Sequence, residues 1–232
     1  MGTGQPWLSI IIPTLNEQDR IGVLLDILQP CRHQAVELIV VDGGSHDQTV
    51  TIARRLADHC IVTSPGRAHQ QNAGAALARG ELLWFVHADS GLQREQWRAL
   101  YSLQRSASEP FWGRFDVRMD SSGHVLIFIA IMMNLRSRLT GIATGDQGIF
   151  VSRTLFSSIG GFPQQPLMED VEISHRLRRI SSPVCLHNTI VVDSRRWQKR
   201  GVWRTMLQMW WLRLRYFLGA DPAVLHREYY RD

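Results

Sequence analysis

Acidic side chains follow three apolar runs in the first ninety residues of this sequence. Glu17 lies shortly after the first run, Asp42 comes directly after the second, and Asp89 closes the triplet His-Ala-Asp after the third. The runs are residues 7–12, 37–41 and 81–86. Parallel strands bring their carboxyl ends to one edge of a sheet, and open α/β sheets bind ligands at that edge. Each carboxylate alone is also an ordinary helix cap or turn residue, but three in succession predict one shared pocket.

These residue types match what a nucleoside-diphosphate sugar needs. Asp42 is placed to accept a hydrogen bond from a base, and Arg67 brings a guanidinium to a helix N-terminus, where phosphates bind. Asp89 offers a hard oxygen ligand for Mg2+ or Mn2+ bridging a diphosphate. Later in the chain, Glu169 and Asp170 offer carboxylates able to take a proton from an acceptor hydroxyl. This pair also has a purely structural interpretation, because carboxylates favour the first turn of a helix.

Strand and helix patterns alternate about four times before residue 90. The helix patterns cover residues 18–28, 48–58 and 68–79, and a further short strand covers 60–63. This order predicts an α/β fold with a mostly parallel central sheet, right-handed crossovers and helices on both faces, as in Rossmann-like domains.

The second half continues with mixed elements. Helix patterns cover 93–105, 125–139, 154–159, 168–179 and 203–218; strand patterns cover 111–119, 148–151, 184–186 and 189–192; residues 221–232 form a polar tail. There is neither an internal repeat nor a low-complexity linker. The sequence therefore predicts a single domain over residues 1–232, with a nucleotide-binding half at about 1–92 and an acceptor half at about 93–232.

Composition limits the partners. The 232 residues carry a formal net charge of +5 and a pI near 9.6, which suits an ordinary basic surface, an anionic substrate or an anionic membrane. Nucleic acid is the weakest candidate, because the basic residues are scattered and lack a recognised binding motif. Cys31, Cys60 and Cys185 are widely spaced, which argues against a disulfide framework and favours the cytoplasm. The N-terminus lacks the pattern of a secretory signal.

A membrane-surface interpretation arises at residues 203–218, WRTMLQMWWLRLRYFL. Aromatic and aliphatic residues share one face of this basic helix, a pattern of helices lying on a bilayer; a core-facing helix of the acceptor half is the alternative. No apolar run reaches the roughly 18 residues of a spanning helix. Peripheral contact at the inner face of a membrane would fit a lipid-linked acceptor.

Five segments together resemble a known family. SIIIPTLNE (9–17), VDGGSHDQT (41–49) and GRAHQQNAGAALARGELLWFVHADS (66–90) resemble the nucleotide-binding half of inverting family 2 glycosyltransferases with the GT-A fold. TGDQGIFVSRTLFSSIGGFP (144–163) and MEDVEISHRLRR (168–179) resemble their acceptor half. HADS and RRWQKRG are similar to a bacterial subgroup associated with radical-SAM and selenocysteine-domain proteins. The resemblance covers nearly the whole chain.

The resemblance implies a role for each matching residue. Asp170, in its pair with Glu169, is the implied catalytic base, and Asp89 is the implied metal ligand at the last position of the family's Asp-x-Asp motif. The implied substrate-binding residues are Pro13, Asn16, Glu17, Asp42, Gly43, Arg67, Asn72, His87, Ala88, Asp89, Arg195, Arg196 and Trp197, the last three as a basic aromatic segment over the diphosphate. The implied reaction is one in-line displacement with inversion at the anomeric carbon.

One position departs from the family pattern. His87 stands where the motif usually has its first aspartate, so the Mg2+ or Mn2+ site keeps one carboxylate. His87 either ligates the metal, which would favour Mn2+, or is a histidine satisfied by protein partners. The weakened motif leaves open a sugar-nucleotide-binding or membrane-surface protein without catalysis. A nucleotidyltransferase is a further alternative, but PTLNEQ after the first strand is not the Gly-rich basic loop that it would require.

Overall fold

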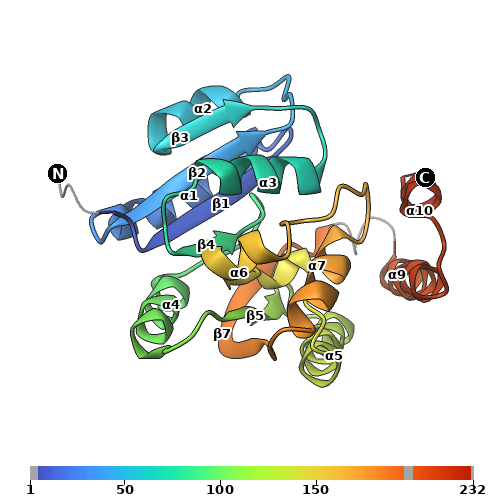
Figure 1. The fold of residues 1–232 in the computed structure, drawn as a ribbon. Helices are drawn as coiled ribbons and strands as arrows, with labels where there is room; N and C mark the ends of the chain where they lie inside the picture. The colour runs from blue at the N-terminus through green and yellow to red at the C-terminus, as the bar shows by residue number, and fades with distance from the viewer. Residues whose placement is uncertain (1–4, 196–200, 231–232) are drawn as a thin grey trace.

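A seven-stranded sheet runs through the computed structural model, which describes residues 5–195 and 201–230 (Figure 1). The strands are β1 Leu8–Thr14, β2 Val36–Asp42, β3 His59–Val62, β4 Leu82–Phe85, β5 Trp112–Met119, β6 Phe150–Ser152 and β7 Val184–Val192. Their order across the sheet is β3-β2-β1-β4-β6-β5-β7. Only β6 runs against its neighbours, so the predicted mostly parallel sheet is confirmed.

Helices cover both faces of this sheet, as predicted. They are α1 Gln18–Arg32, α2 Thr49–Leu56, α3 Arg67–Leu77, α4 Arg94–Ser106, α5 His124–Thr140, α6 Arg153–Ser158, α7 Glu169–Arg178, α9 Val202–Phe217 and α10 Pro222–Tyr229, with a 3-10 turn η1 at Gly145–Gln147. Alternate side chains of β1 divide the core: Ile10 and Ile12 pack with α1, α2 and α4, while Ile11 packs with α3, α6 and α7. Burial on both faces explains the continuous apolar runs of the central strands.

Three details differ from the sequence-based expectation. Strand β1 continues through Pro13 to Thr14. The two short strands expected near residue 187 form one strand, β7, because a bulge in its pairing with β5 absorbs the polar residues between them. The tail is not irregular: Asp221 caps α10 by accepting from the Ala223 N–H at 2.8 Å, and Pro222 starts the helix.

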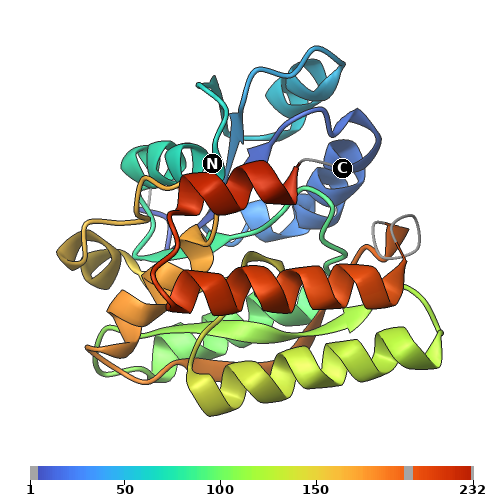
Figure 2. The ribbon, with the colours of Figure 1, turned by 90° about the vertical axis from the view of Figure 1, so that its right-hand side faces the viewer.

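The C-terminal helices pack beside the carboxyl edge of the sheet (Figure 2). Leu212 of α9 and Leu225 and Tyr229 of α10 are buried against Met168 and Val171 at the start of α7. The C-terminal part of the chain thereby supports the segment that carries Glu169 and Asp170.

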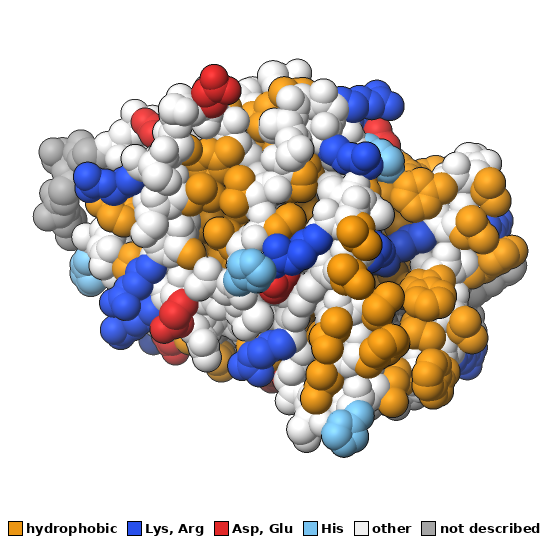
Figure 3. Space-filling view, turned by 90° about the horizontal axis from the view of Figure 1, so that it is seen from below, with side chains coloured by type: hydrophobic (Ala, Val, Ile, Leu, Met, Phe, Trp, Pro, Cys, Tyr) orange, Lys and Arg blue, Asp and Glu red, His pale blue; other side chains and the backbone are white. Residues whose placement is uncertain are grey.

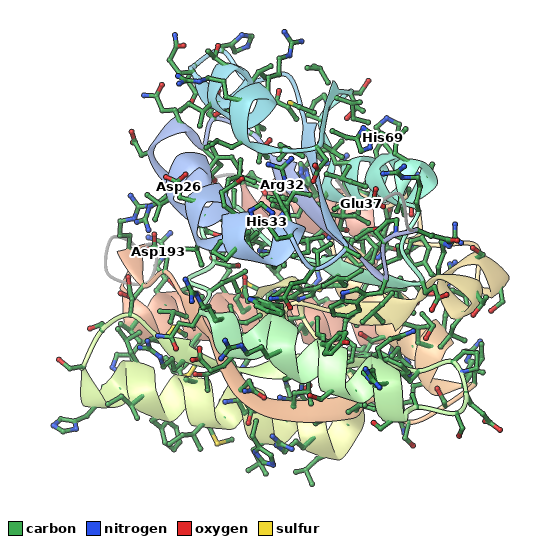
Figure 4. All side chains as sticks on the ribbon, turned by 90° about the vertical axis from the view of Figure 1, so that its left-hand side faces the viewer. Asp26, Arg32, His33, Glu37, His69 and Asp193 are labelled. Carbon is green, nitrogen blue, oxygen red and sulfur yellow. The ribbon has the colours of Figure 1, made fainter. Side chains whose placement is uncertain are left out.

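A buried carboxylate holds the sheet together away from that edge. Glu37 of β2 is 3% exposed and accepts from the Ser9 hydroxyl and the Arg79 N–H, both at 2.6 Å, and from the Arg79 Nε at 3.2 Å. Figure 4, seen from the N-terminal side, labels Glu37 within the fold and Asp26 on α1. Glu37 thus fixes the turn between α3 and β4 to the neighbouring strands.

We expect Glu37→Ala to lower the free energy of unfolding by about 3 kcal/mol, because it leaves the buried Ser9 hydroxyl and the partly buried Arg79 N–H without this acceptor. Urea denaturation followed by circular dichroism measures this loss. Asp26→Ala is the matched control, since Asp26 is exposed and its removal should change stability by less than about 0.5 kcal/mol. Equal losses in the two variants would contradict the assignment.

Candidate active site

The carboxyl edge of the sheet gathers acidic and basic side chains from both halves of the chain. Burial and the negative charge of Asp89 raise the pKa of Glu17, so the residues after β1 and β4 lie close together, as predicted. Arg195 follows β7, and its positive charge partly offsets this rise in the pKa of Glu17. Its Nε donates to Asp193 at 2.7 Å, and Asp193 also pairs with Arg20 at 2.6 Å. This network joins the end of β7 to α1.

The loops after β1 and β2 support each other through polar side chains. Asp42 is fully buried and accepts from the N–H groups of Gly44 and Ser45 at 2.9 and 2.7 Å. Asn16 has φ +54° and accepts from the His46 N–H at 3.0 Å. These hydrogen bonds fix the conformation of the two loops. Binding of a base by Asp42 stays a prediction.

His87 pairs with a residue that sequence reasoning missed. Its Nδ1 lies 3.4 Å from an Asp146 carboxylate oxygen. Burial opposes the charged imidazole, but the hydrogen bond with Asp146 and the negative charges of Asp146 and Asp89 together outweigh it and raise the pKa of His87. Asp146 lies in TGDQG, and the acidic residue within that loop motif was the available signal. The pairing supports the interpretation of His87 as a histidine satisfied by the protein.

Asp170 is held in a fixed orientation at the same edge. One carboxylate oxygen accepts from the Gly145 N–H and the other from the Val171 N–H, both at 2.8 Å. The preceding Met168 has φ +65°, a left-handed conformation that costs energy for a residue with a side chain. Strain of this kind clusters at functional sites. The turn places Asp170 half-exposed and its neighbour Glu169 buried.

Glu169 is the strongly perturbed member of the pair. Burial, followed by the negative charge of Asp170, raises the pKa of Glu169 to about 7 from an ordinary value of 4.5. The two acids therefore differ: Glu169 is buried and partly protonated near neutral pH, whereas Asp170 is more accessible. Asp170 is the more accessible candidate base, and Glu169 lies behind it.

We expect Glu169→Gln to stabilise the fold at pH 8 and to have little effect at pH 4. Below pH 4.5 the Glu169 carboxyl is mostly protonated in the folded and in the unfolded chain. Between pH 4.5 and about 7 it ionises in the unfolded chain first, so the contribution of Glu169 to the free energy of unfolding falls as the pH rises. The gain at pH 8 is on the order of 1–3 kcal/mol. Urea denaturation at both pH values measures it. Glu172→Gln, which removes an ion pair with Arg176, should show no such gain; equal behaviour would contradict the assignment.

Three arginines line this part of the edge. Arg67 is exposed to solvent, although many protein atoms surround it and disfavour its charge; Glu169, Tyr230 and Tyr229 outweigh that effect and raise its pKa. Burial and the positive charge of Arg213 lower the pKa of Arg136 to about 10. Within residues 5–195 and 201–230, the Arg136 Nε and Nη2 and the Arg213 Nε are buried without a hydrogen-bond partner. Arg136 also interacts electrostatically with Asp170, and Arg213 interacts electrostatically with Asp146. Sequence reasoning had placed neither arginine at the site.

The remaining predicted residues lie in different surroundings. Asn72 exchanges two hydrogen bonds with the Phe162 backbone, at 2.8 and 2.9 Å, so its amide tethers the loop after α6. Substrate contact by Asn72 stays a prediction. Pro13 and Ala88 are buried, while Gly43 lies in the loop after β2. Arg196 and Trp197 lie outside the described residues.

The described residues contain no cluster of three or more His, Cys, Asp and Glu side chains able to hold a metal ion. Asp89, however, is exposed and its carboxylate accepts no hydrogen bond from that part of the chain. One free carboxylate fits an ion such as Mg2+, which takes most of its ligands from phosphates and water. It does not form a preorganised metal site without the nucleotide.

The fold is that of GT-A glycosyltransferases. The mannosyltransferase PcManGT from Pyrobaculum calidifontis, solved with GDP-Man and Mn2+, superposes with a TM-score of 0.66 at 23% identity, covering 98% of this chain and 70% of that one. Glucosyl-3-phosphoglycerate synthase from Mycobacterium tuberculosis, solved with Mg2+ and UDP, gives 0.61 at 18% identity, covering 82% and 70%. These likenesses establish the architecture.

The chain belongs to glycosyl transferase family 2, whose family model matches residues 9–125. A PGL/p-HBAD biosynthesis glycosyltransferase of Mycobacterium bovis is 38% identical over 94 residues, which are 38% of this chain and 37% of that protein. The glucosyl-3-phosphoglycerate synthase of Mycolicibacterium paratuberculosis is 32% identical over 92 residues, or 35% and 28% of the two chains. The chain therefore matches only about a third of the length of these curated relatives.

Proposed function

We propose that this protein is an inverting glycosyltransferase that moves a sugar from a nucleoside-diphosphate sugar to an acceptor hydroxyl. The observation that carries the proposal is that Glu17, Asp89 and His87 lie together at one sheet edge, and that His87 adjoins Gly145, whose N–H holds Asp170. Family membership supports it, as do the solved relatives, which were determined in complex with GDP-Man and Mn2+ or with UDP and Mg2+. The bacterial subgroup suggested by HADS and RRWQKRG remains part of this proposal.

On the donor side, cations and one carboxylate surround the expected position of the diphosphate. Arg67 stands at the N-terminus of α3, where its guanidinium and the helix dipole both favour phosphate. Asp89 would hold Mg2+ or Mn2+, which would neutralise charge on the departing diphosphate. Arg195, anchored by Asp193, adds a second positive charge near Glu17. Together these groups stabilise the leaving group as its bond to the sugar breaks.

On the acceptor side, Asp170 takes the proton from the attacking hydroxyl. The N–H groups of Gly145 and Val171 fix its carboxylate, so little reorganisation accompanies the proton transfer. Attack from this side, with the diphosphate leaving from the other, inverts the anomeric carbon. Arg136 and Arg213 each have a buried guanidinium nitrogen without a hydrogen-bond partner in the described part of the chain. They lie close to Asp170 and Asp146, on the side that the acceptor would enter.

A second candidate is a sugar-nucleotide-binding protein without catalysis. The observation that favours it is the His87–Asp146 pair, which occupies the position where the family motif has a metal-binding aspartate. This candidate predicts donor binding without transfer or hydrolysis of the sugar.

Donor binding is tested by a thermal-shift panel of UDP-, GDP- and CDP-sugars, each with and without Mg2+ and Mn2+. A ligand that binds only the folded state raises its apparent stability by mass action. We expect one nucleotide series to raise Tm, with a larger shift when metal is present; no shift with any donor would refute the proposal. Mass spectrometry for sugar transfer or donor hydrolysis then separates the enzyme from the non-catalytic candidate, and the anomeric configuration of the product tests inversion.

A further inference from the structure

Two helices expose apolar side chains that the fold does not use. The outward residues of α5 are Val125, Ile127, Phe128, Ile131, Met132, Leu135 and Leu139; those of α9 are Trp203, Leu207, Trp210, Trp211, Leu214 and Phe217. We call these side chains the apolar face. They include most of the large hydrophobic residues exposed by residues 5–195 and 201–230. Folded monomers rarely expose contiguous apolar patches of this kind without a binding role.

The two helices form one surface. They lie side by side in Figure 2, and the space-filling view of Figure 3 shows their apolar side chains gathered on one side of the molecule. Met133 of α5 and Met206 of α9 pack into the same small core with Met119. The inward positions of α5, Leu126, Ile129 and Ala130, are already buried in that core. The apolar face is therefore additional to the residues that stabilise the fold.

The charge of the same helices is of one sign. Neither α5 nor α9 contains an Asp or Glu, and together they carry five arginines: Arg136, Arg138, Arg204, Arg213 and Arg215. Arg138 pairs with Asp116, and Arg215 pairs with Glu228 of α10, so these two are held beside the face. Helices that lie on membranes combine Trp, Phe and Leu on one side with arginines on the polar side.

We propose that the apolar face docks on the surface of an anionic lipid bilayer, with α5 and α9 lying in the plane of the interface. Tryptophan is favoured at that depth, where its ring is amphipathic like the headgroup region. No helix in the described part of the chain is long and apolar enough to cross a bilayer, so the contact is superficial. A second copy of the chain fits the face less well, because neither α5 nor α9 offers a carboxylate to the arginines of another copy.

Docking in this way has a consequence for the acceptor, which rests on the proposed function. Helix α9 would meet the lipid through the exposed Trp210 and Trp211, while its Arg213 lies near Asp146. The same helix therefore connects the bilayer with the acceptor side of the site. A lipid that carries a phosphate near its reactive hydroxyl would place that phosphate near Arg136 and Arg213.

Co-sedimentation with vesicles tests the docking directly. The full chain is mixed with phosphatidylcholine vesicles that contain about 30% phosphatidylglycerol, and with pure phosphatidylcholine. We expect binding to the anionic vesicles, weaker binding to the neutral ones, and at least about a tenfold loss in Trp210→Ser/Trp211→Ser/Leu214→Ser, because burial of these side chains drives insertion. The matched control is Val23→Ser/Ile180→Ser, which removes exposed apolar residues elsewhere and should bind like wild type.

Three results would overturn the proposal: no binding to either vesicle, equal binding of the triple variant and wild type, or a dimer in light scattering that the triple variant abolishes while vesicle binding is absent. The last result would assign the face to a second copy. Circular dichroism melts establish that the variants are folded. Vesicle binding is measured without donor, and a donor thermal shift on the same samples reports separately on the proposed function.

Discussion

Asp170→Asn is expected to abolish sugar transfer while leaving donor binding intact. The amide keeps the shape of the carboxylate and can still accept from the Gly145 N–H, which donates to Asp170 at 2.8 Å, but it cannot take a proton from the acceptor. Loss of a general base reduces turnover by about 100- to 10,000-fold. The measurement is kcat for the donor series identified by thermal shift, together with the donor Kd from calorimetry.

The matched control is Glu172→Gln on the same turn of α7. Glu172 pairs with Arg176 and accepts from the Tyr216 hydroxyl, so it faces away from the proposed reaction and its loss should leave kcat within a few-fold of wild type. Unchanged turnover in Asp170→Asn would remove Asp170 as the base. Loss of donor binding in the same variant would show that Asp170 acts on the donor instead.

Asp89→Asn is expected to remove the metal-dependent part of donor binding. Asp89 is exposed and is the proposed metal ligand on the nucleotide side, and a neutral amide is a much poorer ligand for Mg2+ or Mn2+. We expect turnover to fall at least about a hundredfold, because the metal no longer neutralises the leaving diphosphate. Calorimetry of the nucleoside diphosphate, with and without metal, should show a metal-dependent affinity in wild type that is absent from the variant.

Asp19→Asn provides the control, because it removes an exposed carboxylate from the first turn of α1 and should preserve the metal dependence. Binding of the nucleoside monophosphate gives a second comparison. Its affinity should change little in Asp89→Asn, because the monophosphate lacks the diphosphate to which the metal would bind. If wild type and Asp89→Asn respond equally to metal, the ion is held elsewhere or has no part in binding.

The local pattern of the sequence determined the sheet, its helices and the edge at which the site lies. Apolar runs bounded by polar residues specify buried strands, and alternation with helices specifies parallel crossovers, so the positions of Glu17 and Asp89 follow from short-range order. The helix at 222–229 was missed although Asp221-Pro222 is a helix-start signal, because its polar composition hides the face that packs on α7.

The tertiary structure alone decided which distant side chains meet. His87 pairs with Asp146, and Asn72 forms hydrogen bonds with the backbone of Phe162. Arg136 and Arg213 lie near Asp170 and Asp146 although they come from two different helices. These outcomes depend on how α5, α7 and α9 pack. The same packing buries Glu169, which raises its pKa, and leaves the apolar face exposed. Such long-range contacts leave no periodic signal in the sequence, since each is made by single residues on elements that meet only after folding.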